Sequence, residues 1–115
     1  IFPQTYCERK NLPRIKWNSV INKTPIYASS NRSIGGHAPS IYIGTMANKG
    51  LMQVQIQEAI ESHKINYAHL VSDDFNAYFI DRAKQLLDRI EIATGKSVSG
   101  RDSEETIREF GFSLI

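Results

Sequence analysis

A long amphipathic pattern in the second half of the chain limits the folds open to it. Apolar side chains recur there at intervals of three and four residues, which is the spacing of one helix face. The members of this stripe are Phe75, Tyr78, Phe79, Arg82, Ala83, Leu86, Leu87, Ile90 and Ala93. Residues 72–74 read Ser-Asp-Asp and supply an N-cap with negative charge, and Gly95 stops the pattern. The pattern therefore predicts a central helix over about 73–94, against which the rest of the chain packs.

Shorter helices are expected on both sides of this central helix. Residues 40–49 carry a helical pattern that Gly50 closes, and residues 54–63 carry an imperfect apolar stripe. Residues 102–105 read Asp-Ser-Glu-Glu, which resembles a capping box in which Asp replaces Ser or Thr. They predict a short final helix that Gly111 ends.

The N-terminal part has a different pattern. Residues 1–16 are basic and interrupted by prolines, and they predict an irregular loop. The β-branched or aromatic runs 19–22 and 26–28 predict a small strand pair, and Ser29 begins a short helix that ends at a Gly-Gly pair. The expected fold class is therefore α+β: a mostly helical domain with a small N-terminal strand pair.

Length and composition favour one domain. A chain of 115 residues can bury a single core, so residues 1–115 are expected to form one unit, with residues 1–36 at its front and 37–115 as a helical continuation. The chain does not begin with Met, and we expect it to be a piece of a longer protein. No apolar run is long enough for a membrane span. Cys7 has no second cysteine to pair with, which favours a reducing, cytoplasmic setting.

The charge is unevenly distributed along the chain. Residues 1–50 contain seven basic and one acidic side chain, whereas residues 51–115 contain seven basic and eleven acidic ones. A basic N-terminal half favours a polyanionic partner such as DNA. Lysines on solvated loops explain the same charge equally well. Aromatic side chains among the basic ones tilt the interpretation toward nucleic acid.

The histidines do not have the spacing of a metal site. His63 and His69 lie six positions apart, unlike the i, i+4 pair of a helical zinc site. His63 fits better as the C-terminal residue of a helix. His37 follows the Gly-Gly pair and is a candidate phosphate contact.

Two asparagines nine positions apart, Asn22 and Asn31, carry a resemblance to a known family. With the N-terminal Ile-Phe-Pro and with Ile26, they resemble the HNH (ββα-metal) endonuclease motif. The continuation is similar to one branch of that family, the C-terminal domains of bacterial restriction-type proteins that carry an N-terminal ParB-like nucleotidase domain. The similar segments are 31–42 (NRSIGGHAPSIY), 61–65 (ESHKI) and 74–87 (DFNAYFIDRAKQLL).

The resemblance implies metal-dependent hydrolysis of phosphodiester bonds in DNA. It implies that Asn31 is a ligand of a divalent ion such as Mg²⁺ and that Asn22 orients the strand and the general base. Lys23, Arg32 and His37 are the candidate DNA phosphate contacts. The partners implied are DNA and the nucleotidase-like domain of the same parent chain.

One part of the family motif is missing from this chain. The acidic residue and the general-base His should stand immediately before Ile1. We therefore expect the chain by itself not to cleave DNA, and we assign hydrolysis to the intact parent. Two alternatives remain open: a non-catalytic helical DNA-binding module and a protein-interaction module.

Overall fold

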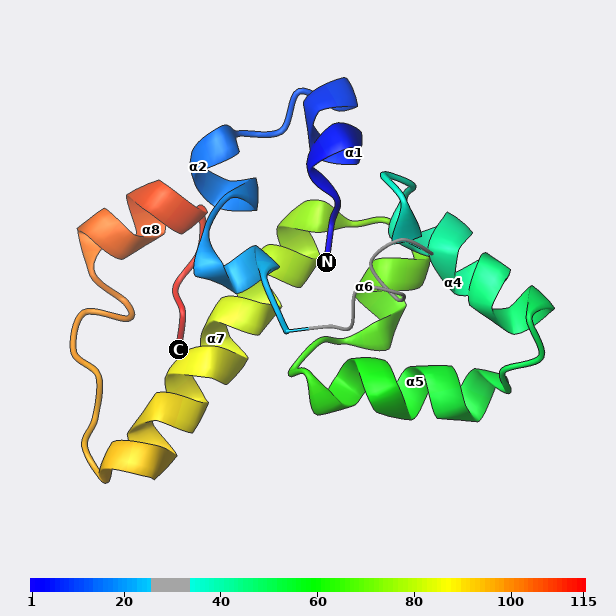
Figure 1. Cartoon of the computed structure of the whole chain (residues 1–115). Coiled ribbons are helices and arrows are strands. Elements are labelled where there is room, and N and C mark those ends of the chain that lie inside the picture. The colour runs from blue at the N-terminus through cyan, green and yellow to red at the C-terminus, as the bar shows by residue number, and fades with distance from the viewer. Residues whose placement is uncertain (26–33) are drawn as a thin grey trace.

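The computed structural model describes residues 1–25 and 34–115, and every regular element in these ranges is helical (Figure 1). In chain order they are α1 (Gln4–Arg9), α2 (Arg14–Trp17), the 3₁₀ helix η1 (Val20–Asn22), α4 (Pro39–Asn48), α5 (Gln53–Ser62), α6 (Tyr67–Val71), α7 (Phe75–Thr94) and α8 (Glu104–Phe110). None of these described helices combines the length and the apolar character needed to cross a bilayer.

The predicted central helix is confirmed as α7. The side chain of Asp74 accepts a hydrogen bond from the backbone N–H of Ala77 and so caps its first turn. Gly95 ends the helix in the left-handed conformation with φ of 68°, which a residue without a Cβ adopts at no steric cost. Tyr78, Phe79 and Ala83 are buried along its core-facing side.

Three other helices lie close to their predicted positions. Helices α4 and α5 begin and end within one residue of the expected bounds. Helix α8 has Ser103 rather than Asp102 as its N-cap, because the Ser103 hydroxyl accepts from the N–H of Thr106. Gly111 closes α8 in a left-handed conformation, as predicted.

The predicted strand pair, and with it the α+β class, is wrong for the described residues. Val20 to Asn22 forms the 3₁₀ helix η1, and the Ser19 hydroxyl caps it by accepting from the N–H of Ile21. Its carbonyl groups bond to side chains of α7 instead of to a neighbouring strand. The other half of the predicted pair, residues 26–28, lies outside the described residues.

The N-terminal loop prediction is also wrong, because residues 1–16 contain α1 and most of α2. Pro3 and Pro13 are the N-cap residues of these two helices, where a missing N–H costs nothing. Interpreted only as breaks, these prolines had suggested no helix. Helix α6, whose N-cap Asn66 accepts from the N–H of Ala68, was not predicted.

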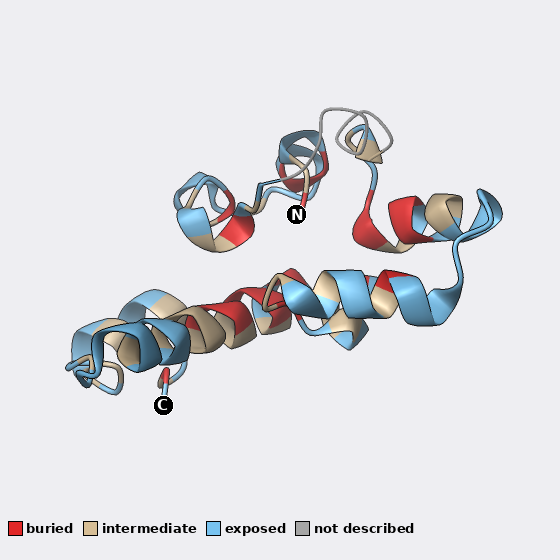
Figure 2. Cartoon of the chain, turned by 60° about the horizontal axis from the view of Figure 1, so that its bottom comes forward, coloured by how far each residue is buried: buried red, intermediate tan, exposed pale blue. Residues whose placement is uncertain are grey.

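The core gathers around Phe2, which is 1% exposed. Its ring centroid lies 4.9 Å from that of Tyr78 and 5.2 Å from that of Phe75, so the N-terminal segment packs directly onto the first half of α7. Figure 2 shows the buried residues concentrated where that half of α7 meets the other helices. The aromatic row continues through Phe79 to Phe110 of α8, with a centroid distance of 5.6 Å for that pair.

Candidate functional site

Asn22 joins three parts of the fold through one buried side chain. Its Oδ1 accepts from the backbone N–H of Phe2 at 2.9 Å and from the hydroxyl of Tyr78 at 3.0 Å. Its Nδ2 donates to the carbonyl of Phe2 at 2.8 Å and to that of Trp17 at 2.9 Å. An amide side chain has two acceptor and two donor positions, and all four are used here. Asn22 is thus fully committed to holding the segment at Phe2.

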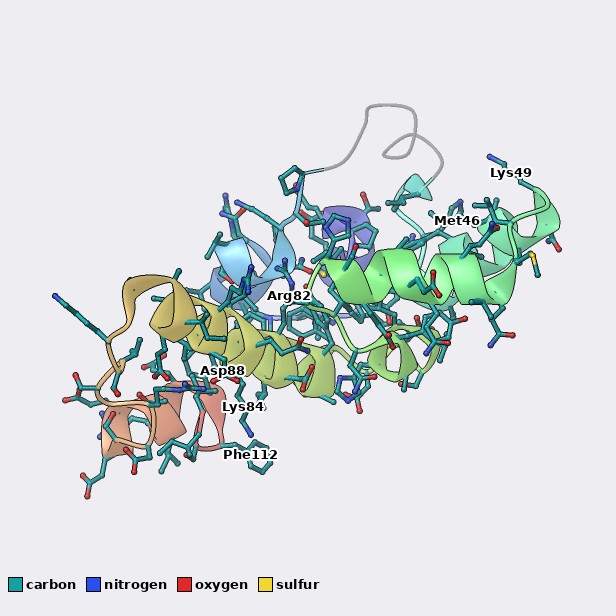
Figure 3. All side chains as sticks on the ribbon, turned by 90° about the horizontal axis from the view of Figure 1, so that it is seen from below. Met46, Lys49, Arg82, Lys84, Asp88 and Phe112 are labelled. Carbon is teal, nitrogen blue, oxygen red and sulfur yellow. The ribbon has the colours of Figure 1, made fainter. Side chains whose placement is uncertain are left out.

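The 3₁₀ helix η1 is itself held in place from α7. Arg82 is 5% exposed and points from α7 toward the N-terminal elements (Figure 3). Its Nη1 donates to the carbonyls of Ile21 and Lys23, the latter at 3.0 Å. Its Nε and Nη2 each donate to the carbonyl of His63 at 3.2 Å. The guanidinium therefore joins η1 to the C-terminal end of α5.

Arg82 is a buried cation that is surrounded by backbone carbonyl groups. No carboxylate of the described ranges lies within ion-pair distance of it, and its partners are backbone carbonyls. Burial lowers the pKa of Arg82 from its ordinary value, although nearby Tyr78 acts in the opposite direction. Burial also raises the pKa of Tyr78 above its usual range, so its hydroxyl stays protonated and donates to Asn22.

The amine of Ile1 lies at the same junction. It donates to the carbonyl of Asn22 at 3.2 Å. Burial, with the positive charge of Arg82 as the second cause, lowers the pKa of this amine from 8.0 to about 6.

Lys23 and His37, the predicted phosphate contacts in the described ranges, are held by different parts of the fold. Lys23 is the C-cap of η1 and its side chain is exposed. His37 is exposed and follows Gly36, whose carbonyl accepts from Arg9 at 3.4 Å. Gly36 also approaches α1 closely, because an added Cβ would lie 3.2 Å from Cβ of Thr5. His37 is thus held beside α1, while Lys23 follows η1.

The metal prediction finds no support in the residues that the structure places. Asn31 and Arg32 lie outside the described residues, so the predicted metal ligand and one predicted phosphate contact are not placed. Within residues 1–25 and 34–115, no three side chains of His, Cys, Asp or Glu come together in a way that could hold a metal ion. The amide oxygen of Asn22 has both acceptor positions filled by protein donors. These residues do not fit a divalent ion by themselves.

Sequence reasoning missed two residues that build the site, Tyr78 and Arg82. A signal was present in the apolar stripe of α7, where Arg82 occupies a core-facing position between Phe79 and Ala83. A charged side chain in such a position needs buried partners. That requirement indicated that Arg82 would have buried polar partners, although not which ones.

Comparison with known proteins gives one distant relative. An uncharacterized protein of Methanocaldococcus jannaschii is 28% identical over an alignment of 112 positions that covers 78% of this chain and 19% of that protein. The chain thus spans about a fifth of the length of the relative that it matches. No family model and no solved structure matches the chain.

Proposed function

We propose that this chain is the C-terminal part of an HNH-type DNA endonuclease of a restriction or defence protein, and that Asn22 is a positioning residue of its site. The proposal rests on the two hydrogen bonds that join the Asn22 amide to the backbone of Phe2. In the family that the sequence resembles, the middle asparagine of the motif orients the strand and the general base. The contacts of Asn22 with the backbone of Phe2 support a positioning role of this kind.

The remaining assignments follow from the resemblance. Asn31 is proposed as the ligand of a divalent ion, and Lys23, Arg32 and His37 as phosphate contacts. Exposure of Lys23 and His37 suits that role, since a phosphate contact must be reachable. Hydrolysis, a cytoplasmic setting and a nucleotidase-like domain in the same parent chain are parts of the same proposal.

A plasmid-nicking assay tests this function. The 115-residue chain and a longer protein that includes an upstream Asp-His pair are each incubated with supercoiled plasmid and Mg²⁺, Mn²⁺ or Ni²⁺. We expect nicking by the longer protein, loss of nicking with EDTA or with Asn31→Ala, and none by the chain. Absence of nicking by the longer protein with all three ions contradicts the proposal. Metal-dependent nicking by the chain itself, abolished by Asn31→Ala, contradicts the assignment of hydrolysis to the parent.

A non-catalytic nucleic-acid-binding module is the second candidate. Its support is that exposed basic side chains, Arg9, Lys10 and Arg14, lie on or next to α1 and α2. Metal-independent DNA binding by a longer protein that does not nick plasmid under any of the conditions above would favour it.

A further inference from the structure

The first two helices carry a concentration of positive charge that the proposed site does not use. Within residues 1–25 there are five basic side chains, Arg9, Lys10, Arg14, Lys16 and Lys23, and one acidic side chain, Glu8. Glu8 accepts a hydrogen bond from the amide of Gln4. The side-chain ion pairs found in the described ranges involve Arg101 with Asp88 and Glu91, at the other end of the molecule. The cations of α1 and α2 are therefore not neutralised by carboxylates there.

The two helices form a platform that the core holds in place. They pack against each other at one end of the molecule, at the top of Figure 1. Cys7 of α1 is fully buried and Trp17 of α2 is 8% exposed, so each helix is anchored by at least one side chain. A short helix anchored in this way presents its outward side chains in fixed positions.

Aromatic rings pre-position three of these cations. The guanidinium carbon of Arg9 lies 5.9 Å from the ring centroid of Tyr6, and that of Arg14 lies 6.0 Å from that of Trp17. Nζ of Lys16 lies 5.8 Å from the ring centroid of Phe79 on α7. Contacts of this kind restrict long side chains before a ligand arrives, which lowers the entropy cost of binding.

Helix α2 also carries an exposed apolar side chain next to its cations in the sequence. Ile15 is 82% exposed and lies between Arg14 and Lys16 in the sequence of α2. Exposed apolar side chains among phosphate-binding cations occur in proteins that insert a wedge into a DNA groove. A membrane surface fits less well, because interfacial helices need a broad apolar face. Helix α2 has four residues, and its Trp17 is turned into the core.

We infer that the outer surface of α1 and α2 binds duplex DNA without a metal ion. Arg9, Lys10, Arg14 and Lys16 contact phosphates, and Ile15 contacts the groove between them. The choice of DNA among polyanions rests on the proposed function, whereas the position of the surface rests on the charge and geometry of α1 and α2. We call these five residues the α1–α2 surface.

Salt-dependent binding tests the α1–α2 surface. A fluorescein-labelled 20-base-pair duplex is titrated with the chain in EDTA at several salt concentrations, and anisotropy is measured. Four phosphate contacts predict a slope of log K against log salt of about −3 to −4. Trp17 is the sole tryptophan of the sequence and lies on α2, so its emission should change in the same titration.

A pair of charge-matched variants locates the binding surface. Arg14→Glu/Lys16→Glu should weaken binding by at least about tenfold and flatten the salt slope by about 2. Arg89→Glu/Lys96→Glu changes the net charge equally on exposed residues at the far end of α7, and it should change affinity less than about twofold. Ile15→Gln should weaken binding without changing the slope. Circular dichroism verifies folding, and Lys10→Gln/Lys16→Gln replaces the first pair if that pair does not fold.

The outcomes separate this inference from the nuclease proposal. The inference is contradicted if the two charge-reversal variants lose the same affinity for the duplex. It is also contradicted if the chain binds anionic phosphatidylglycerol vesicles but not the duplex. Nicking by the longer protein with affinity unaffected by Arg14→Glu/Lys16→Glu also overturns it and leaves the nuclease standing. If the longer protein binds the duplex but does not nick plasmid, and Arg14→Glu/Lys16→Glu abolishes that binding, the result supports DNA binding by the α1–α2 surface and contradicts the proposed nuclease function.

Discussion

The hydroxyl of Tyr78 donates to Asn22 Oδ1 at 3.0 Å, and the same oxygen accepts from the backbone N–H of Phe2 at 2.9 Å. The central helix and the N-terminal segment therefore meet at one atom. The carbonyl oxygen of Ile21 also lies 3.0 Å from the Tyr78 hydroxyl, so its single proton is shared between this carbonyl and Asn22 Oδ1. Substitutions of Tyr78 and of Asn22 should therefore have coupled effects on the free energy of unfolding.

Replacing Asn22 should destabilise the chain strongly. Asn22→Ala leaves the N–H and C=O of Phe2 and the carbonyl of Trp17 without their partner in a buried place. We expect a loss of about 2–4 kcal/mol in the free energy of unfolding, measured by urea denaturation. Asn18→Ala is the matched control, because Asn18 is exposed, and it should cost under about 0.5 kcal/mol.

The coupling with Tyr78 gives the same prediction a second measurement. Tyr78→Phe removes the hydroxyl, and the double variant with Asn22→Ala should lose less stability than the sum of the two single variants, by at least about 0.5 kcal/mol. Strict additivity would contradict the shared hydrogen bond.

Arg82→Met should also be costly although it removes a buried charge. The carbonyls of Lys23 and His63 lose their donors, that of Ile21 keeps only the shared hydroxyl of Tyr78, and methionine cannot replace the lost donors. We expect a loss of about 2–4 kcal/mol, seen as a lower midpoint of thermal unfolding. The control is Arg89→Met on the exposed side of α7. A variant as stable as the native chain would show that apolar packing compensates for the lost bonds.

Two neighbouring aspartates should differ in their contribution to stability. Asp73 accepts from the backbone N–H of Ser40 at 2.9 Å and from its hydroxyl at 2.6 Å, whereas Asp74 accepts from the N–H of Ala77. Asp73 also has φ of 55°, which alanine adopts less readily than aspartate. Asp73→Ala should therefore cost about 2–3 kcal/mol, and Asp74→Ala about 1 kcal/mol, the usual value of an N-cap. Equal losses in chemical denaturation would contradict this assignment.

Stability should rise with pH between about 6 and 8. Burial lowers the pKa of the Ile1 amine of this 115-residue chain to about 6 in the folded state, from an ordinary value of 8.0. The unfolded state therefore binds more protons in this window, so raising the pH favours the folded state, by about 2–3 kcal/mol in all. Comparing unfolding of the chain with that of the same chain acetylated at Ile1 isolates this effect from the histidines. Identical pH profiles would contradict it.

Local signals were sufficient for the helices that end in recognisable caps. Asp74 and Gly95 bound a clear apolar stripe, and α7 follows from them. Ser103 and Gly111 do the same for α8, and only the choice of the capping residue differed. These features lie within a few residues of the helix that they determine, so sequence pattern contains them.

The structure of the N-terminal part of the chain depends on residues that are distant in the sequence. Val20 and Ile21 favour a strand by propensity. Their carbonyls, however, accept hydrogen bonds from Arg82 and Tyr78, which lie about sixty positions further along the sequence. The hydrogen bonds of Asn22 could be assigned only once the positions of its partners were known. The roles of Asn31 as a metal ligand and of Arg32 as a phosphate contact stay predictions. The basic residues of α1 and α2 were counted in the sequence but could not be seen as one surface, because their prolines suggested a loop.

Nicking kinetics of Asn22→Asp in the longer protein test the central claim most directly. The variant keeps both acceptor positions and loses the two donors, to Phe2 and Trp17. If Asn22 positions the segment at Phe2, kcat for plasmid nicking should fall by about tenfold to a hundredfold with duplex affinity unchanged. Asp73→Asn serves as a control that alters a hydrogen-bonded residue elsewhere and should leave kcat near the native value. A kcat for Asn22→Asp equal to that of the native protein would contradict the claim.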